Sequence, residues 1–417
     1  MITIKNQIIS KILISLFLIT YFIPNFSAID RIGNQWFFLS IMSFLSIIFI
    51  IKDQNLYTKI KSTIFEKSSI LYLIFILWTL SSISYSYNKV EALVTFNQFF
   101  SIFISFIIIK TLLHNIPNGI DFILKLFLIL LTLEVFMSLI PIIKDIENNK
   151  LLIRSMDYKG ASANINITSF SILYKTPILL YFLTKEKKIY MKFIFIFLLF
   201  SIFLIISILG TRGAYIGTII CVISYLAFLL KTNFKILFKI KQFAILCLTL
   251  ILVLFANVNL TQGGTDAISR ASTISLNTED GSVNSRLRYY KQGINHFIEN
   301  PIIGVGIGNW KLFSIDYDKN NIDAFIVPYH AHNDFIQLLV ELGLLGLIFY
   351  ILFIFFSVNK LFKNSFFDDH INFLLLGSLL IYLLDSMINF PIARPISQLF
   401  LITFLCLVSL YEKKAHE

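Results

Sequence analysis

The chain has 417 residues, of which 57% are hydrophobic and only 14% are charged, and its mean hydropathy is +0.80. These values lie far outside the composition of soluble domains and indicate an integral membrane protein. The formal net charge of +11 could suggest a nucleic-acid partner, but the basic residues are spread over loops between apolar segments, which argues against that class.

Twelve apolar runs are long enough to cross a bilayer as helices, because a hydrocarbon core of ~30 Å requires roughly 17 to 25 residues. They cover about residues 9–26, 34–51, 68–86, 92–109, 120–140, 165–183, 190–209, 214–230, 243–258, 335–356, 371–390 and 395–411. The first run resembles a signal peptide, but further spans follow it, which favours an uncleaved helix. The sequence predicts an all-α polytopic membrane protein with about 12 transmembrane helices in a single membrane domain over residues 1–417.

Lysine and arginine residues are distributed unequally between the predicted loops. Nineteen lie on one side, including Lys188 and Lys239, and eight lie in the short loops of the other side. By the positive-inside bias, both the N- and C-termini are cytoplasmic. Cys221, Cys247 and Cys406 all lie inside predicted spans, so we expect neither a disulfide framework nor a CxxC-type metal motif.

Two charged residues fall inside predicted spans. Glu134 and Lys175 lie at compatible depths in consecutive antiparallel segments. The simplest interpretation is a buried ion pair that neutralises both, which is weak evidence for function.

The stretch 257–333 is the one large loop, and the predicted topology places it outside the cytoplasm, where function is expected. Within it, "SRLRYYKQGINHFIENP" predicts an amphipathic helix on the bundle or the membrane surface, with Ser285 as N-cap and Pro301 as its stop. Its apolar positions are Leu287, Tyr290, Ile294, Phe297 and Ile298. At 100° per residue Arg286 borders this stripe and points inward, whereas Arg288 points outward. A snorkelling interface residue is the alternative interpretation of Arg286.

The next segment, "NPIIGVGIGNW", contains Gly304, Gly306 and Gly308. A nucleotide-binding loop requires a preceding strand and a later acidic residue in a βαβ unit, which this context lacks. We interpret the glycines as permitting a tight chain reversal.

Polar residues also open the apolar run that follows, in "YHAHNDFIQLLVELGLLG". Asn333 and Asp334 are candidate N-caps, with Gln337 completing a capping box. Asp334, Gln337 and Glu341 are spaced i, i+3, i+7, so this polar stripe must face the bundle interior or a wet cavity, and the helix lines a site. Packing is a sufficient explanation for Gly343 and Gly346.

His332 lies just before this helix N-terminus, where the helix dipole disfavours the imidazolium form. A neutral imidazole is the state that a general base requires. His330, His332 and Asp334 could instead bind a metal ion, but their spacing is weak evidence and no further ligand cluster exists.

Four stretches resemble the O-antigen ligase and polymerase superfamily. "HNDFIQLLVELGLLG" fits its pattern of histidine, asparagine, nine residues, glycine, two residues and glycine, with His332, Asn333, Gly343 and Gly346 at these positions. The other three are "GTRGAYIG", "SRLRYYKQGINHFIENPIIGVGIGNW" and "KGASANINITSFSIL". The resemblance covers the chain from about Lys159 to Arg394.

The resemblance implies a GT-C-like glycosyltransferase of the Gram-negative inner membrane that needs no metal and no cofactor. Its donor would be an undecaprenyl diphosphate-linked glycan, its acceptor lipid A-core, and its active site would face the periplasm. His332 matches the essential catalytic histidine, and Arg212 and Arg286 match arginines that hold the diphosphate. The residues expected to support them are Asn333, His330, Asp385 and Asn164.

The residues also fit this chemistry on physical grounds. A lipid-linked sugar diphosphate contains its own leaving group, so fixed arginines can take up the charge that is released. His332 would deprotonate the acceptor hydroxyl for direct attack at the anomeric carbon, which predicts inversion. The amphipathic loop helix would close the site over the lipid head and limit hydrolysis.

Three alternatives stay open at this point. A transporter or flippase also suits many helices with buried charges, but the chain shows no matched halves, and the loop with Arg286 and His332 favours an enzyme. An O-antigen polymerase and a protein O-oligosaccharyltransferase share the same motifs. The short tail after the last predicted helix favours ligase or polymerase over the protein-modifying enzymes.

Overall fold

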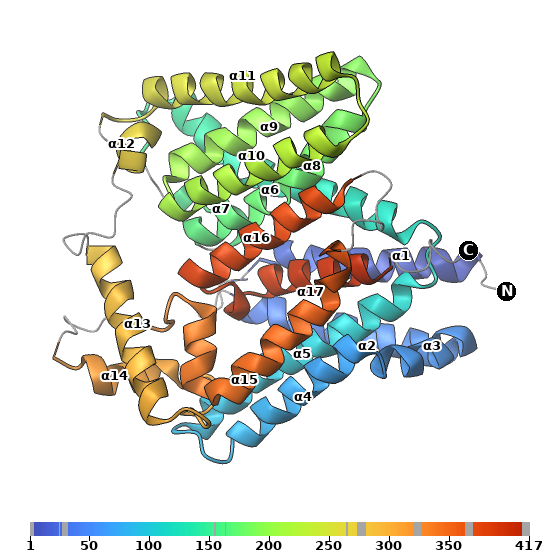
Figure 1. Cartoon of the computed structure of the whole chain (residues 1–417), viewed down its shortest axis with the longest axis vertical. Helices are drawn as coiled ribbons and strands as arrows, with labels where there is room; N and C mark the ends of the chain where they lie inside the picture. Colours follow the sequence, from blue (N-terminus) through green and yellow to red (C-terminus); the bar gives the residue numbers. More distant parts are fainter. Residues whose placement is uncertain are drawn as a thin grey trace. The chain divides into compact units, whose positions relative to one another are not determined.

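The computed structural model describes residues 4–24, 26, 32–153, 156–162, 164–263, 266–272, 281–320, 327–362 and 370–410. In this part of the chain every named element is a helix (Figure 1). One isolated β-bridge joins Leu152 to Thr261. The expected all-α class is therefore confirmed.

The chain divides into two compact units. Unit 1 comprises Met1–Ile120, Leu276–Lys360 and Ser386–Glu417, and unit 2 comprises Asp121–Ser275 and Leu361–Asp385. Unit 1 contains α1 (Ile4–Ile19), α2 (Gly33–Lys52), α3 (Gln54–Ile64), α4 (Lys67–Ser82), α5 (Lys89–Leu113), α13 (Gly281–Glu299), α14 (Trp310–Asp318), α15 (Asp334–Val358) and α17 (Pro395–Leu410). Unit 2 contains most of α6 (Gly119–Glu147) and of α16 (Asn372–Ile388), with α7 (Ile165–Leu173), α8 (Thr176–Lys185), α9 (Ile189–Leu209), α10 (Arg212–Lys231), α11 (Ile236–Leu260) and α12 (Ala267–Ser272).

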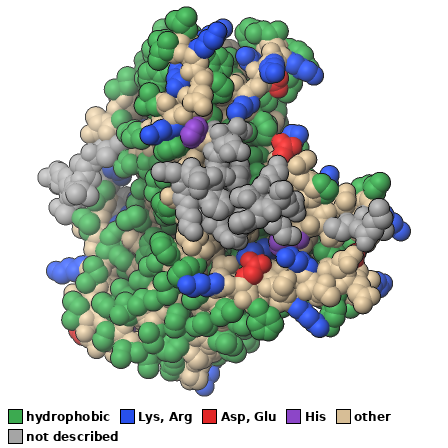
Figure 2. Space-filling model, turned by 45° about the vertical axis from the view of Figure 1, so that its right-hand side comes forward, with side chains coloured by type: hydrophobic (Ala, Val, Ile, Leu, Met, Phe, Trp, Pro, Cys, Tyr) green, Lys and Arg blue, Asp and Glu red, His purple; other side chains and the backbone are tan. Residues whose placement is uncertain are grey.

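Each of the twelve predicted segments coincides with a helix or a broken pair of helices. Within the described ranges, nine helical segments are long and apolar enough to cross a membrane. The predicted spans 68–86, 371–390 and 395–411 coincide with the shorter helices α4, α16 and α17, of 16, 17 and 16 residues. The protein is thus a multi-pass membrane protein with about nine candidate spans, and the count of twelve stays a prediction. Hydrophobic side chains cover large continuous areas of the face drawn in Figure 2.

A bend of 69° separates α3 from α4. At this corner the Lys110 ammonium of α5 lies 2.7 Å from the Glu66 carboxylate and donates to the Ser68 hydroxyl at 3.1 Å. The Lys110 side chain is buried. Its interactions fasten the corner to α5.

The segment predicted to span at 165–183 is interrupted between α7 and α8, next to the expected ion pair. Lys175 Nζ lies 2.7 Å from Glu134 Oε1 and also donates to the Ser171 carbonyl at 2.7 Å. The Ser171 hydroxyl donates to the other Glu134 oxygen at 2.9 Å. The predicted pair is confirmed, and removing one partner would leave a buried charge at a cost of about 3–5 kcal/mol.

Helix α15 is broken at Gly343, whose φ and ψ are 66° and −171°. The backbone groups released by the break bond to neighbouring chain: Val305 N donates to Val340 O, Gly306 N to Glu341 O and Leu344 N to Pro301 O, at 2.9, 2.9 and 3.0 Å. A Cβ on Gly343 would lie 2.1 Å from the Ile302 carbonyl oxygen. Packing between helices was therefore the wrong explanation for Gly343, which is required for a backbone break and a close backbone approach.

Candidate functional site

The loop that carries the two histidines joins directly to α15. Asn333 is the N-cap, and its side-chain oxygen accepts from Phe335 N and Ile336 N at 3.0 and 3.1 Å. Asp334 is already the first helical residue and instead accepts from Ile392 N at 3.0 Å, so its interpretation as an N-cap was wrong. His332, just before the cap, has a φ of 55°, in the left-handed region.

The polar stripe of α15 faces inward, as predicted, and each of its members fastens a different loop. Asp334 accepts from the turn at Ile392, and the Gln337 side-chain oxygen accepts from Ala331 N at 3.2 Å. Glu341 accepts from Gly308 N at 2.9 Å, from Trp310 N at 3.1 Å and from Gln337 at 3.2 Å. Burial of a carboxylate is favourable only with such compensation. The stripe thus holds the loops that carry His330, His332 and Arg394.

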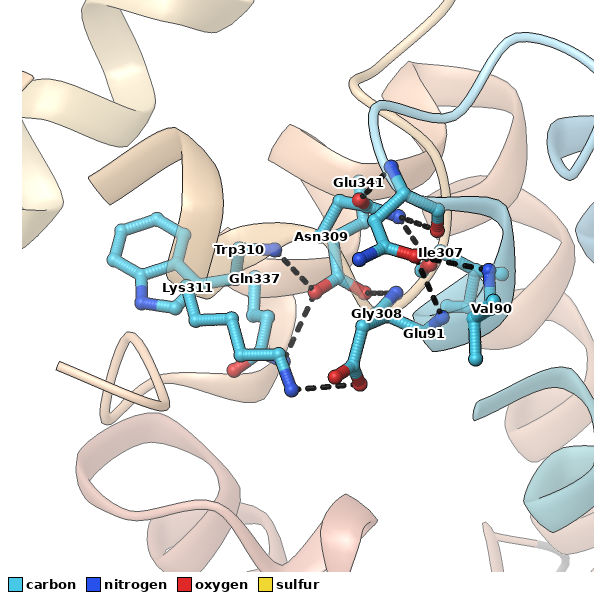
Figure 3. Close-up of polar contacts among 10 residues, drawn as sticks. Val90, Glu91, Ile307, Gly308, Asn309, Trp310, Lys311, Gln337 and Glu341 are labelled. Carbon is cyan, nitrogen blue, oxygen red and sulfur yellow. Dashed lines mark hydrogen bonds and ion pairs between the residues drawn. The ribbon is translucent and has the colours of Figure 1, made fainter. Parts of the chain in front are cut away.

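The glycine-rich segment forms a tight turn clamped between α5 and α15 (Figure 3). Asn88 N donates to the Asn309 side-chain oxygen at 2.7 Å, and Lys311 pairs with Glu91 at 2.6 Å. Gly306 and Gly308 have φ of 93° and 73°, and a Cβ on them would lie 2.2 Å from Ser86 Cβ and 2.3 Å from Thr95 Oγ1. The structure agrees with the chain-reversal interpretation of these glycines.

Phe390 lies between the two histidines. The His330 ring stacks on it with centroids 4.3 Å apart, and the His332 ring meets it edge-on at 5.1 Å. The Arg394 guanidinium lies 5.0 Å from the centre of the same ring. Phe390 was not predicted as a site residue, because an aromatic residue at the end of a predicted span carries no local signal of its tertiary partners.

Tyr290 of α13 fastens the same loop. Its hydroxyl donates to the His332 carbonyl oxygen at 2.8 Å and to the Met387 carbonyl oxygen at 3.1 Å. Burial raises the pKa of Tyr290, although the nearby Arg286 charge and a hydrogen bond with Asn333 oppose that shift. From the sequence, Tyr290 was predicted only as one position of an apolar stripe.

Both histidines are held neutral. Burial, with the Arg286 charge, lowers the pKa of His332 to about 4. Burial, followed by the Arg394 charge, lowers the pKa of His330 to about 3. The helix dipole was expected to keep His332 neutral, whereas burial and the Arg286 charge lower its pKa in the structure.

Helix α13 differs from its prediction at its N-terminus, because it begins at Gly281 and Ser285 lies inside it rather than at its N-cap. Its predicted apolar stripe is largely uncovered by protein, with Leu287, Ile294 and Ile298 exposed by 38, 47 and 70%, which is compatible with the predicted alternative of a helix on the membrane surface. The helix instead buries Gln292, Gly293 and His296, because Gly293 permits close contact with Ile336 and Val340 of α15.

The predicted contrast between the two arginines of α13 was wrong. Arg286 acts electrostatically on His332 and is half-buried. Arg288 is also half-buried, and its guanidinium lies 5.6 Å from the centre of the Tyr289 ring. The exposed polar residues described in this helix are Asn284, Lys291, Asn295 and Glu299.

Four predicted site residues therefore meet in unit 1: His330, His332, Asn333 and Arg286. The other three belong to unit 2. Arg212 is the half-buried first residue of α10, Asn164 is the N-cap of α7, and Asp385 is buried in α16. Among the residues that the structure describes, no three His, Cys, Asp or Glu side chains are grouped as metal ligands would be.

A comparison with known families agrees with the motifs around this site. Residues 181–351 match the family model described as O-antigen ligase. The matched segment is thus similar to the O-antigen ligase family. This O-antigen ligase segment includes Arg212, Arg286, His330, His332 and Asn333, and it excludes Asn164 and Asp385. No curated protein matches the chain.

Proposed function

We propose that this protein is an inverting glycosyltransferase that joins undecaprenyl diphosphate-linked O-antigen to lipid A-core in lipopolysaccharide biosynthesis. The observation that carries the proposal is a neutral His332 beside Arg286 within the O-antigen ligase segment. The enzyme would lie in the inner membrane of a Gram-negative bacterium as a GT-C-like bundle. Both termini would be cytoplasmic and loop 257–333 periplasmic.

His332 is the group that we assign to proton transfer. It takes the proton of the acceptor hydroxyl as that oxygen attacks the anomeric carbon of the donor sugar. The new glycosidic C–O bond forms as the C–O bond to the diphosphate breaks, and undecaprenyl diphosphate leaves with the bonding electrons. Attack opposite the leaving group inverts the anomeric centre.

The arginines take up the charge of the leaving group. Arg286 presents planar, multidentate donors that match phosphate oxygens and keep their charge. We assign Arg212 the same role on the evidence of its motif, with Asn164 and Asp385 as supporting residues. Asn333 and His330 support His332 from the same loop.

Donor binding would also prepare the base. A group with a pKa of about 4 accepts a proton poorly near neutral pH. A bound diphosphate offsets the Arg286 charge and places negative charge near His332, and both effects raise the pKa of the imidazole. His332 would therefore become an effective base only when the donor is in place.

The proposal is tested by deleting the gene and separating the lipopolysaccharide on a gel. Loss of a ligase should leave long polymer on undecaprenyl diphosphate and a core without O-chain. Core capped with a single repeat would instead identify an O-antigen polymerase, the alternative that the family match leaves open.

A further test compares two cationic positions on α13. Arg286→Lys keeps the charge but loses the forked donor arrangement, and it should reduce transfer by about tenfold or more. Lys291→Gln, on the exposed face of the same helix, should retain transfer. Equal activities of the two variants would contradict a diphosphate-binding role for Arg286.

A further inference from the structure

An open groove of about 240 Å³ lies between α6 and α9 of unit 2. Among the residues that line it are Leu128, Thr132 and Phe136 of α6 and Met191, Phe195 and Leu198 of α9. Both hydroxyl groups in the lining are used within their own helices: Thr132 donates to Leu128 O at 2.8 Å and Ser201 to Phe197 O at 2.9 Å. The walls therefore suit an apolar chain rather than a polar ligand.

The length of the groove matches one leaflet of a bilayer. Its α9 wall extends from Met191 to Ser201, which corresponds to about 15 Å at 1.5 Å per residue. This is roughly half of a ~30 Å hydrocarbon core. An acyl chain that enters from the α9 N-terminal end would thus fill it.

Positive charge gathers at that end of α9. Lys185, Lys187, Lys188 and Lys192 lie within eight residues, with Glu186 as the single acid among them. The Glu186 carboxylate already accepts from the backbone N–H groups of Lys187 and Lys188, both at 2.8 Å. Lys192 lies in the first turn of α9, next to the lining residue Met191, and is half-buried.

This end is remote from the residue assigned to the donor in unit 2. Arg212 follows the opposite end of α9, and the helix has 21 residues, or about 31 Å. A lipid phosphate at the lysines therefore lies about one membrane thickness from Arg212. The ligand of the groove is for this reason a different lipid from the glycan donor.

We propose that the groove binds an acyl chain of an anionic phospholipid whose phosphate contacts Lys188 and Lys192. Clusters of lysines next to membrane-spanning helices attract anionic headgroups, each lysine adding to the affinity. The site holds a lipid of the leaflet opposite to the proposed active site. It stands independently of the glycosyl-transfer reaction.

Native mass spectrometry of the full-length, delipidated protein tests this site. Offered equal amounts of phosphatidylglycerol and phosphatidylcholine, the protein should retain phosphatidylglycerol about tenfold more. The combined Lys187→Gln, Lys188→Gln and Lys192→Gln variant should lose this preference. The control removes three exposed lysines from the α10–α11 region, Lys231→Gln, Lys235→Gln and Lys241→Gln, and should keep it.

A second variant addresses the apolar part of the site. Thr132→Trp fills the groove and leaves the lysines in place, so it should reduce retention of phosphatidylglycerol without changing the elution volume of the protein. Equal retention of both phospholipids, or an unchanged preference in the variant lacking Lys187, Lys188 and Lys192, would overturn the proposal. So would lysine-dependent retention of a polyprenyl diphosphate in preference to phosphatidylglycerol. Disulfide cross-linking of two copies through Phe136→Cys in lipid-free protein would assign the groove to a dimer interface instead.

Discussion

At the scale of single residues, His332 combines a left-handed backbone with a buried, neutral ring. Its φ is 55°, a conformation that histidine, asparagine and aspartate adopt more readily than most residues with a side chain. A hydrogen bond from Tyr290 to its carbonyl oxygen and the edge contact with Phe390 fix its position. A proton acceptor held in this way is positioned before the substrate arrives.

Two substitutions at His332 should distinguish the loss of its imidazole from an effect on its left-handed backbone. His332→Ala removes the base, and we expect transfer to fall by about 10²- to 10⁴-fold. His332→Asn tolerates the left-handed backbone and should lose the same activity while it unfolds at the wild-type temperature. Transfer assays on purified protein, with thermal unfolding alongside, measure both effects. Near-normal transfer by either variant would remove the general-base role.

The dependence of transfer on pH follows from the same residue. The pKa of His332 is lowered to about 4, so the ring is neutral at higher pH and becomes protonated as the pH falls through that value. Because kcat/KM reports groups of the free enzyme, it should fall only below about pH 4 to 5. Arg286→Gln removes a charge that lowers this pKa, so the acidic limb should move to higher pH. An acidic limb already near pH 6.5 in wild-type protein would show that burial does not control this histidine.

At the scale of elements, the break in α15 determines how the glycine-rich turn is placed. Gly343→Ala puts a Cβ where the Ile302 carbonyl oxygen lies 2.1 Å away, at a φ of 66°. Backbone strain alone should lower the free energy of unfolding by about 1–3 kcal/mol. The glycine-rich turn, whose Gly308 and Trp310 N–H groups donate to Glu341, should also shift. The temperature of thermal unfolding, measured in detergent, should be clearly lower for this variant than for the wild type. Gly263→Ala, with no atom within 4 Å of the added Cβ, is the control and should be neutral.

Sequence patterns located the elements better than their interruptions. Apolar runs predicted helices at all twelve positions, because hydrophobicity over about twenty residues is a strong signal. The breaks at Gly343 and Lys175 were not predicted, since the groups that satisfy them, such as the N–H of Val305, come from distant parts of the chain.

The candidate site was likewise predicted only in part. The motifs identified His332, Asn333 and Arg286, while Phe390 and Tyr290 emerged as neighbours only through tertiary contacts. The prediction that Arg288 points outward was wrong, because a helical wheel assumes that the apolar face of a helix is the buried one. In α13 the small Gly293 decides which face packs.

At the scale of the whole molecule, the number of membrane crossings is the main open prediction, and it depends on the short helices α4, α16 and α17. The position of α4 can be tested through its contacts. This helix has 16 residues, about 24 Å, which is short for a ~30 Å core. Its C-terminal side leads to Tyr87 and Asn88, which hydrogen bond with Val305 and Asn309 of the glycine-rich turn. The turn after α4 and the loop before α15 must therefore lie on one side of the membrane.

Reporter fusions along the chain test this topology. If α4 crosses, a fusion at Lys61 should report the cytoplasm and fusions at Tyr87 and Lys319 the periplasm. Lys188 and Lys239 should report the cytoplasm, as the lysine asymmetry predicts. A fusion at Thr278, in the same predicted loop as Lys319, should also report the periplasm; this residue lies outside the part of the chain that the structure describes. Signals from the same side at Lys61 and Tyr87 would mean that α4 does not cross, and a periplasmic signal at Lys239 would place the proposed active site on the wrong face.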